Sequence, residues 1–249
     1  MSGSRPTRAL PPAATDLPLD DGPVMRSPMH RLHRALEATF TTEGAWEVPA
    51  GYGDEAGERQ VLDATVGLAD ITARGKLDLR GGLDAVLGRL DLAAAPPVTG
   101  EVVALAPAGG AGGGLLARIS GRRALALCPH PDLAARLEAM EAAAGEAPVM
   151  VTDATSLHAG LLLAGPNTAA VLSRLTALDP ARLAPATCVA TRLAEIPAIL
   201  VRRELPGTVL EVYAGSEYGR YAWETLLAAV RARGGRPVGW RALRALGWW

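Results

Sequence analysis

The sequence has few of the residues that would mark several common classes of protein. Its only cysteines, Cys128 and Cys188, stand apart without the C-x-x-C spacing of a zinc site, so we expect two small buried hydrophobic side chains. No apolar run approaches the ~20 residues that a membrane-spanning helix needs. The net charge of −1 gives no electrostatic reason to expect nucleic acid or an anionic membrane as a partner.

The N-terminal segment lacks the apolar middle that a secretory signal requires. It carries several prolines together with Asp16, Asp20 and Asp21. We therefore expect residues 1–27 to form a flexible tail, and the cytoplasm is the default location.

The rest of the chain has the composition of a globular protein with a substantial core. Hydrophobic residues make up 49% of the 249 residues and charged residues 20%. Each half shows strands, a helix, strands and a helix, without the regular alternation that builds a parallel sheet. We predict an α+β fold of two lobes of mainly antiparallel sheet with packed helices. We expect the lobes to cover residues 28–148 and 149–249, and we allow for the chain to cross between them.

The individual elements follow from the spacing of apolar residues and from the turn residues between them. The 3.6-residue spacing, with proline and glycine at the ends, predicts helices over 29–39, 55–66, 83–92, 131–144, 165–178 and 217–233. Short apolar or alternating runs predict strands over 77–79, 102–105, 115–119, 124–127, 149–153, 158–164, 198–202 and 209–213.

Several apparent motifs do not meet the requirements of the sites they suggest. The glycine run Gly109–Gly114 is followed by a predicted strand and lacks the Gly-Lys-Ser/Thr of a P-loop, so we interpret it as a hairpin loop. His30 and His33 could bind zinc with a third ligand, but we expect one solvated and one packed side chain. No G-x-S-x-G elbow supports a serine hydrolase. We predict neither a metal site nor a catalytic nucleophile.

Four blocks of sequence occur in an order that resembles a known family. The first, residues 28–82, combines Pro-x-His-x-x-His, Trp-x-x-Pro-x-x-Tyr, a helix ending in Val-Gly-Leu-Ala-Asp, and the strand Gly-Lys-Leu-Asp-Leu-Arg before two glycines. The others are residues 153–166, 196–226 and 237–244. Together they resemble the glycine-cleavage T-protein superfamily of folate-binding proteins. It includes the aminomethyltransferases, the C-terminal halves of dimethylglycine and sarcosine dehydrogenases, and the folate-binding subunits of heterotetrameric sarcosine oxidases.

This resemblance implies tetrahydrofolate as cofactor, a role in one-carbon and amine metabolism, and a pterin site. The acid that matches the family's pterin-binding carboxylate is Glu211. Strand alternation places it on the face opposite Leu210 and Val212, where a buried carboxylate could accept hydrogen bonds from the pterin ring. An ordinary exposed strand glutamate is the alternative.

The remaining candidates for the folate site are one aromatic and three basic residues. Tyr213 could stack on a ring, whereas Trp223 at helical spacing is more typical of a core. The anionic glutamyl tail of folate is expected to meet arginine, and the candidates are Arg202, Arg203 and Arg241.

The chain also departs from the family at positions that carry the chemistry. Aligning residues 113–116 with the family's Gly-Gly turn places Ala117 or Arg118 where the transferases have an amine-orienting acid. Residues 202–208 replace the usual Tyr-Thr-Gly-Glu-x-Gly loop. The chain stops at Trp249, where the full enzymes continue into a third, barrel-like domain.

These departures favour a folate-binding protein that has lost the transferase acid. It would act as a binding or structural subunit, with subunits of a flavin-dependent amine oxidase or dehydrogenase as partners, and we expect the terminal residues 247–249 to be covered by such a partner. One alternative is an active aminomethyltransferase that uses Asp78 or Glu211 to orient the amine. Another is a structural relic whose pocket is closed.

Overall fold

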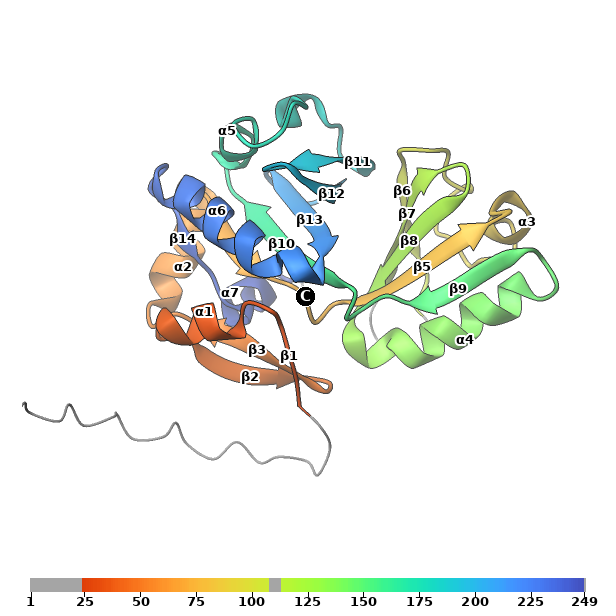
Figure 1. Ribbon diagram of the computed structural model, residues 1–249, viewed down its shortest axis with the longest axis horizontal. Coiled ribbons are helices and arrows are strands. Elements are labelled where there is room, and N and C mark those ends of the chain that lie inside the picture. The colour runs from red at the N-terminus through yellow and green to blue at the C-terminus, as the bar shows by residue number, and fades with distance from the viewer. Residues whose placement is uncertain (1–23, 108–112, 249) are drawn as a thin grey trace, which may run out of the picture.

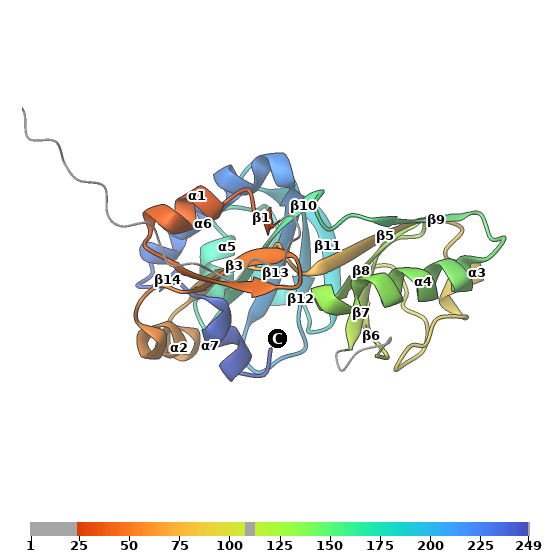
Figure 2. The ribbon, with the colours of Figure 1, turned by 90° about the horizontal axis from the view of Figure 1, so that it is seen from below.

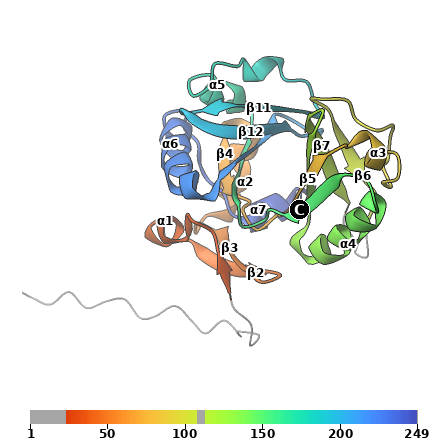
Figure 3. The same cartoon turned by 45° about the vertical axis from the view of Figure 1, so that its right-hand side comes forward.

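The computed structural model describes residues 24–107 and 113–248. These residues form three β-sheets, and the two larger sheets lie in separate lobes (Figure 1). The three-stranded sheet and its helix lie beneath the six-stranded sheet, on the side away from β11 (Figure 3). Among the residues described, no helix is both long and apolar enough to span a bilayer.

The six-stranded sheet has the order β11-β12-β13-β10-β4-β14 and is antiparallel except for the short parallel pair of β14 with β4. One face is covered by α6, which buries a stripe of apolar side chains against it: Ala222, Trp223, Leu226, Leu227 and Val230. Its elements are β4 (Gly67–Asp70), β10 (His158–Ala164), α5 (Thr168–Leu172), β11 (Thr187–Leu193), β12 (Ile196–Arg202), β13 (Val209–Gly215), α6 (Gly219–Arg231) and β14 (Arg236–Pro237).

The five-stranded sheet is antiparallel throughout, with the order β6-β7-β8-β5-β9. Helix α4 runs along one face and packs Leu137 and Met140 near Leu77 and Leu79, while β9 forms the outer margin of the sheet (Figure 2). Its elements are β5 (Gly75–Gly81), α3 (Asp84–Leu87), β6 (Val102–Leu105), β7 (Gly114–Ser120), β8 (Arg123–Cys128), α4 (Leu133–Ala144) and β9 (Val149–Asp153).

The three-stranded sheet lies near the start of the described chain, in the order β1-β3-β2. Buried Trp46 and Val48 of this sheet pack against Trp240 of α7, which joins it to the end of the chain. The elements of this part are β1 (Met25–Arg26), α1 (His30–Ala35), β2 (Thr39–Glu43), β3 (Trp46–Gly51), α2 (Glu55–Ala64) and α7 (Trp240–Ala245).

The faces of the two large sheets that α6 and α4 do not cover contribute to one apolar cluster. Val201 and Tyr213 come from the six-stranded sheet, Ala117 and Leu125 from the five-stranded sheet, and Leu243 from α7. Residues more than 80 positions apart in the sequence therefore share one buried region.

The predicted α+β class with two lobes of mainly antiparallel sheet is confirmed. The strands predicted over 149–153 and 158–164 have the same bounds in the structure. Both cysteines are free and buried, as expected. The chain passes between the sheets twice, because β4 joins the six-stranded sheet and β9 the five-stranded one.

Other elements differ from the prediction. The helix predicted over 29–39 ends at Ala35, because Glu37 takes a positive φ of 58° and the chain turns into β2. Residues 25 and 26, predicted as part of a flexible tail, pair with β3 instead. Residues 1–23 and the glycines from Gly109 to Gly112 lie outside the described residues.

Candidate functional site

Glu211 lies in the middle of β13, between Leu162 of β10 and Val201 of β12. Its strand neighbours Leu210 and Val212 pack into the core beneath α6, as alternation predicted. Glu211 therefore points to the opposite face, the one that contributes to the cluster shared with the five-stranded sheet, and its side chain is fully buried.

Three side chains satisfy the Glu211 carboxylate. Arg74 and Arg203 each donate from Nη1 to Oε1 in an ion pair, and the Tyr213 hydroxyl donates to Oε2 at 2.7 Å. Burial by itself would raise the pKa of Glu211, but the two guanidinium groups and the Tyr213 hydroxyl lower it below its ordinary value. Burial next to Glu211 raises the pKa of Tyr213, so that its hydroxyl keeps its proton. The centre of the fold thus holds an ionised carboxylate.

Arg74 is carried by the turn between β4 and β5, and a buried lysine fixes this turn. The ammonium group of Lys76 donates to the carbonyls of Thr72 and Arg74, both at 2.7 Å, and to that of Thr155 at 3.1 Å. Burial lowers the pKa of Lys76 to about 7. The one lysine of the chain therefore serves to position the backbone from which Arg74 reaches Glu211.

Sequence reasoning missed Arg74, which is 137 residues from Glu211. The available signal was a lone arginine in the short segment Ile71–Arg74, between two strands that are buried almost throughout. A cation in such a place needs an anion nearby, because an unpaired buried charge is strongly destabilising. The identity of that anion could not be read from the sequence.

The structure brings together three of the five predicted folate-site residues: Glu211, Arg203 and Tyr213. Arg202 instead donates to the carbonyls of Gly207 at 3.0 Å and Val209 at 3.4 Å. These hydrogen bonds stabilise the loop between β12 and β13. Arg241 lies exposed on α7, and no described contact joins it to Glu211.

Ala117 and Arg118, the two residues that align with the family's amine-orienting acid, point to opposite sides of β7. Ala117 on β7 is buried in the cluster between the sheets, opposite Leu125 of β8. Arg118 points the other way and donates to the carbonyl of Pro97 at 3.0 Å and to Asp84 at 2.7 Å. Residue 117 therefore faces the six-stranded sheet, and its methyl group has no acid–base chemistry.

Asp78, the other acid considered for orienting an amine, lies on β5 between two arginines. Arg80 donates to Oδ2 from Nε at 2.9 Å and from Nη2 at 2.8 Å. Arg123 donates from Nε to Oδ1 at 3.0 Å and from Nη2 to Oδ2 at 3.1 Å. Both acids that could replace the motif carboxylate are thus paired with two guanidinium groups.

The histidine pair near the start of the described chain has a structural explanation. His33 is buried, with Nε2 at 2.8 Å from Asp70, Nδ1 at 2.9 Å from the Tyr52 hydroxyl, and its ring edge-on to Trp223 at 4.5 Å. His30 instead contacts Glu47. No group of three or more metal-ligating side chains occurs in the part of the chain that is described.

The last described residue packs against its own chain. Trp248 is half-buried and packs on the cluster between the sheets, and its N–H bonds to the carbonyl of Leu243 at 3.2 Å. Its own chain therefore covers Trp248 in part, and coverage of residues 247–249 by a partner subunit stays a prediction. Trp249 is outside the described residues.

Comparison with known proteins identifies the family. The GCVT N-terminal domain family matches residues 29–247, and the chain belongs to it. Curated relatives include the aminomethyltransferase of Streptomyces coelicolor, 25% identical over 86% of this chain and 59% of that protein. The aminomethyltransferase of Mycobacterium tuberculosis is 27% identical over 87% of this chain and 60% of that protein. The chain spans about three fifths of the length of these relatives.

Two solved structures share the fold. One is the glycine cleavage system aminomethyltransferase T from Bartonella henselae, with a TM-score of 0.76 and 20% identity over 90% of this chain and 62% of that chain. The other is a heterotetrameric sarcosine oxidase from Corynebacterium sp. U-96, in complex with pyrrole 2-carboxylate. Its matching chain has a TM-score of 0.61 and 23% identity over 84% of this chain and 95% of that chain.

Proposed function

We propose that this chain binds tetrahydrofolate between its two large sheets and does not itself catalyse aminomethyl transfer. The observation that carries the proposal is the ionised, fully buried Glu211, held next to Tyr213 on the face shared with the five-stranded sheet. The edge of a pterin offers adjacent N–H donors that a carboxylate accepts in a directional pair. Membership of the GCVT N-terminal domain family supports this ligand.

Pterin binding requires that Glu211 exchange one of its present partners. Arg203 is the more exposed of its two arginines, and it begins the loop that connects β12 to β13. Arg203 would therefore turn away and meet the anionic tail of the folate, while Arg74 would stay in place. Arg202 and Arg241 remain predictions for the same tail.

The surroundings of the acids argue against chemistry on an amine. A group that orients an amine cation must present negative charge that is not already neutralised. Ala117 has none, and Glu211 and Asp78 are each shared by two guanidinium groups. This arrangement supports a binding or structural subunit that works next to a flavin-dependent amine oxidase or dehydrogenase. The match to 95% of one chain of a heterotetrameric sarcosine oxidase supports a subunit role.

Isothermal titration with a stable reduced folate, 5-formyltetrahydrofolate, tests the proposal. We expect the wild type to bind and Glu211→Gln to lose at least tenfold in affinity, since a charged hydrogen-bonding partner is removed. Glu138→Gln, an exposed change on α4, is the matched control and should bind like the wild type. Because Glu211→Gln leaves two buried arginines without their anion, Glu211→Asp provides a second variant that keeps the charge, and circular dichroism checks the folding of both. Absence of folate binding, together with a pull-down that recovers no partner, would refute the proposal.

The similarity to aminomethyltransferases over most of the chain favours one second candidate, an active transferase. In that case Asp78 or Glu211 would orient the amine in spite of its arginines. An assay for methylenetetrahydrofolate release separates the two candidates. Turnover by the wild type that is abolished in folded Asp78→Asn or Glu211→Asp would establish the transferase, and no turnover with intact folate binding would favour the subunit.

A further inference from the structure

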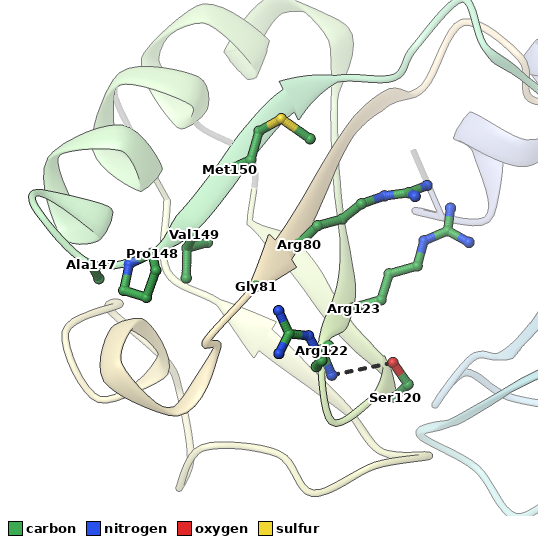
Figure 4. Close-up of a pocket in the computed structure, with 9 residues that line it drawn as sticks. All are labelled: Arg80, Gly81, Ser120, Arg122, Arg123, Ala147, Pro148, Val149 and Met150. Atoms are coloured by element: carbon green, nitrogen blue, oxygen red, sulfur yellow. Dashed lines mark hydrogen bonds between the residues drawn. The ribbon is translucent and has the colours of Figure 1, made fainter.

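An arginine-lined depression of ≈ 640 Å³ lies on the five-stranded sheet, apart from Glu211 and its partners (Figure 4). We call it the arginine pocket and define it by Arg80 of β5, Arg122 of the turn before β8, Arg123 at the start of β8, Ser120, Pro148 and Met150. Three guanidinium groups therefore border one concave surface, where positive charges would repel one another unless anions balance them. Asp78 is the one acid in contact with them among the described residues.

Asp78 holds two of these guanidinium groups in fixed orientations. Arg80 and Arg123 both use the edge formed by Nε and Nη2 to bind the same carboxylate. The N–H groups on Nη1 of each arginine consequently remain available, and none bonds to another described residue. One negative charge between two positive charges leaves an excess of one positive charge, presented by donors that are already ordered.

The guanidinium group of Arg122 supplies positive charge at a second position in the pocket. It lies in the tight turn between β7 and β8, where its N–H donates to Ser120 Oγ at 3.3 Å and its carbonyl accepts from Gly81 N at 3.0 Å. Both ends of its backbone are thus fixed, whereas its side chain is exposed and has no ion pair with a described residue. Figure 4 shows this guanidinium separate from those of Arg80 and Arg123.

The wall of the pocket depends on one glycine. Gly81 has a φ of +133°, and a Cβ added there would lie 2.0 Å from the carbonyl oxygen of Pro148. Glycine therefore lets the end of β5 approach Pro148 closely. Met150 follows on β9 and is 60% exposed, so the pocket combines positively charged groups with an aliphatic surface. Its lining includes no aromatic side chain on which a nucleobase could stack.

From this combination we infer that the arginine pocket binds a short polycarboxylate, in which successive carboxylates are joined by aliphatic spacers. One carboxylate would accept from the free Nη1 groups of Arg80 and Arg123, and the next would pair with Arg122, while the spacer lies on Met150. A γ-linked oligoglutamate has this chemistry. The inference is independent of the pterin site, since no residue of the arginine pocket contacts Glu211.

Titration with tri-γ-glutamate at low ionic strength tests the inference without any pterin present. We expect binding by the wild type and a roughly tenfold weaker affinity in Arg122→Gln, because one charge-assisted contact is lost. This variant should fold normally, since the side chain is exposed. Arg231→Gln on α6 removes an exposed arginine elsewhere and should leave the affinity unchanged.

Two further measurements sharpen the assignment. A tri-γ-glutamate with all carboxylates amidated should not bind, and raising the salt concentration should weaken binding of the acid, because exposed charges are screened. The inference is overturned if the wild type gives no signal with tri-γ-glutamate, if Arg122→Gln and Arg231→Gln bind alike, or if the amidated peptide binds as well as the acid. It is also overturned if inorganic phosphate binds more tightly than tri-γ-glutamate.

Discussion

Two carboxylates in the described part of the chain are each held by two arginines, and they differ mainly in burial. Glu211 is 0% exposed, and its partners Arg74 and Arg203 are 6% and 13% exposed. The side chain of Asp78 is 8% exposed, but its partners Arg80 and Arg123 are 55% and 27% exposed. Chemically similar clusters therefore lie in very different surroundings, one inside the fold and one at its surface.

This difference determines what each cluster can contribute. Charges attract more strongly in the low dielectric of the interior, but each also loses its hydration there, so an inner cluster is stable only when it is complete. The partners of Glu211 must therefore all remain or be replaced by equivalent ligand groups. The arginines around Asp78 keep access to water, so they can bind an additional anion without leaving their carboxylate.

The largest effect should come from breaking the inner cluster. Glu211→Gln removes the charge that balances two buried arginines, so we expect a loss of about 3–5 kcal/mol in the free energy of unfolding. For a chain of this size that is a melting temperature lower by roughly 10 °C. Calorimetry or chemical denaturation measures it, with Glu138→Gln as the control. An unchanged melting temperature would show that Glu211 does not stabilise the folded state through its two arginines.

Acid should weaken the same cluster without a mutation. The pKa of Glu211 is lowered in the folded state from its ordinary value of 4.5. Below that pH the unfolded chain binds more protons than the folded one, so stability falls as the pH drops through the folded pKa. Denaturation measured between pH 6 and pH 3 should show a steeper loss for the wild type than for Glu211→Gln. Parallel curves for the two proteins would contradict this assignment.

The outer cluster should tolerate the corresponding change better. Asp78→Asn leaves Arg80 and Arg123 in contact with water, which can solvate them, so we expect a loss of only about 1–2 kcal/mol. Denaturation in urea provides the measurement, and the loss should be clearly smaller than that of Glu211→Gln. Equal losses in the free energy of unfolding would mean that the exposure of the arginines does not determine how much each cluster stabilises the fold.

The sequence predicts much of the fold because local patterns specify many of its elements. Alternation and turn residues define β9 and β10 to the residue, and helical spacing identifies α4 and α6. The elements that were missed depend on distant partners. Strands β2, β3 and β11 have mixed composition, and the four residues of β4 are recognisable as a strand only because β10 and β14 lie next to them.

The candidate site was predictable to a lesser degree. Alternation places Glu211 on the correct face, and the resemblance to a family singled out Arg203 and Tyr213. Arg74 could not be assigned in the same way, since it pairs with Glu211 across 137 residues of sequence and no local pattern encodes that ion pair. The exposed position of Arg241 follows from how α7 packs, which depends on contacts with β3 and α2 at the other end of the chain.

The smallest effect is expected from an ion pair that is exposed on both sides. Arg220 and Glu224 lie one turn apart on α6, with 72% and 49% of their side chains exposed. Glu224→Gln should change the free energy of unfolding by no more than about 0.5 kcal/mol, because water solvates both groups and salt screens them. Denaturation at low and high salt measures it, and the small difference should shrink as salt rises. A loss as large as that of Asp78→Asn would show that burial does not rank the contributions of these three carboxylates.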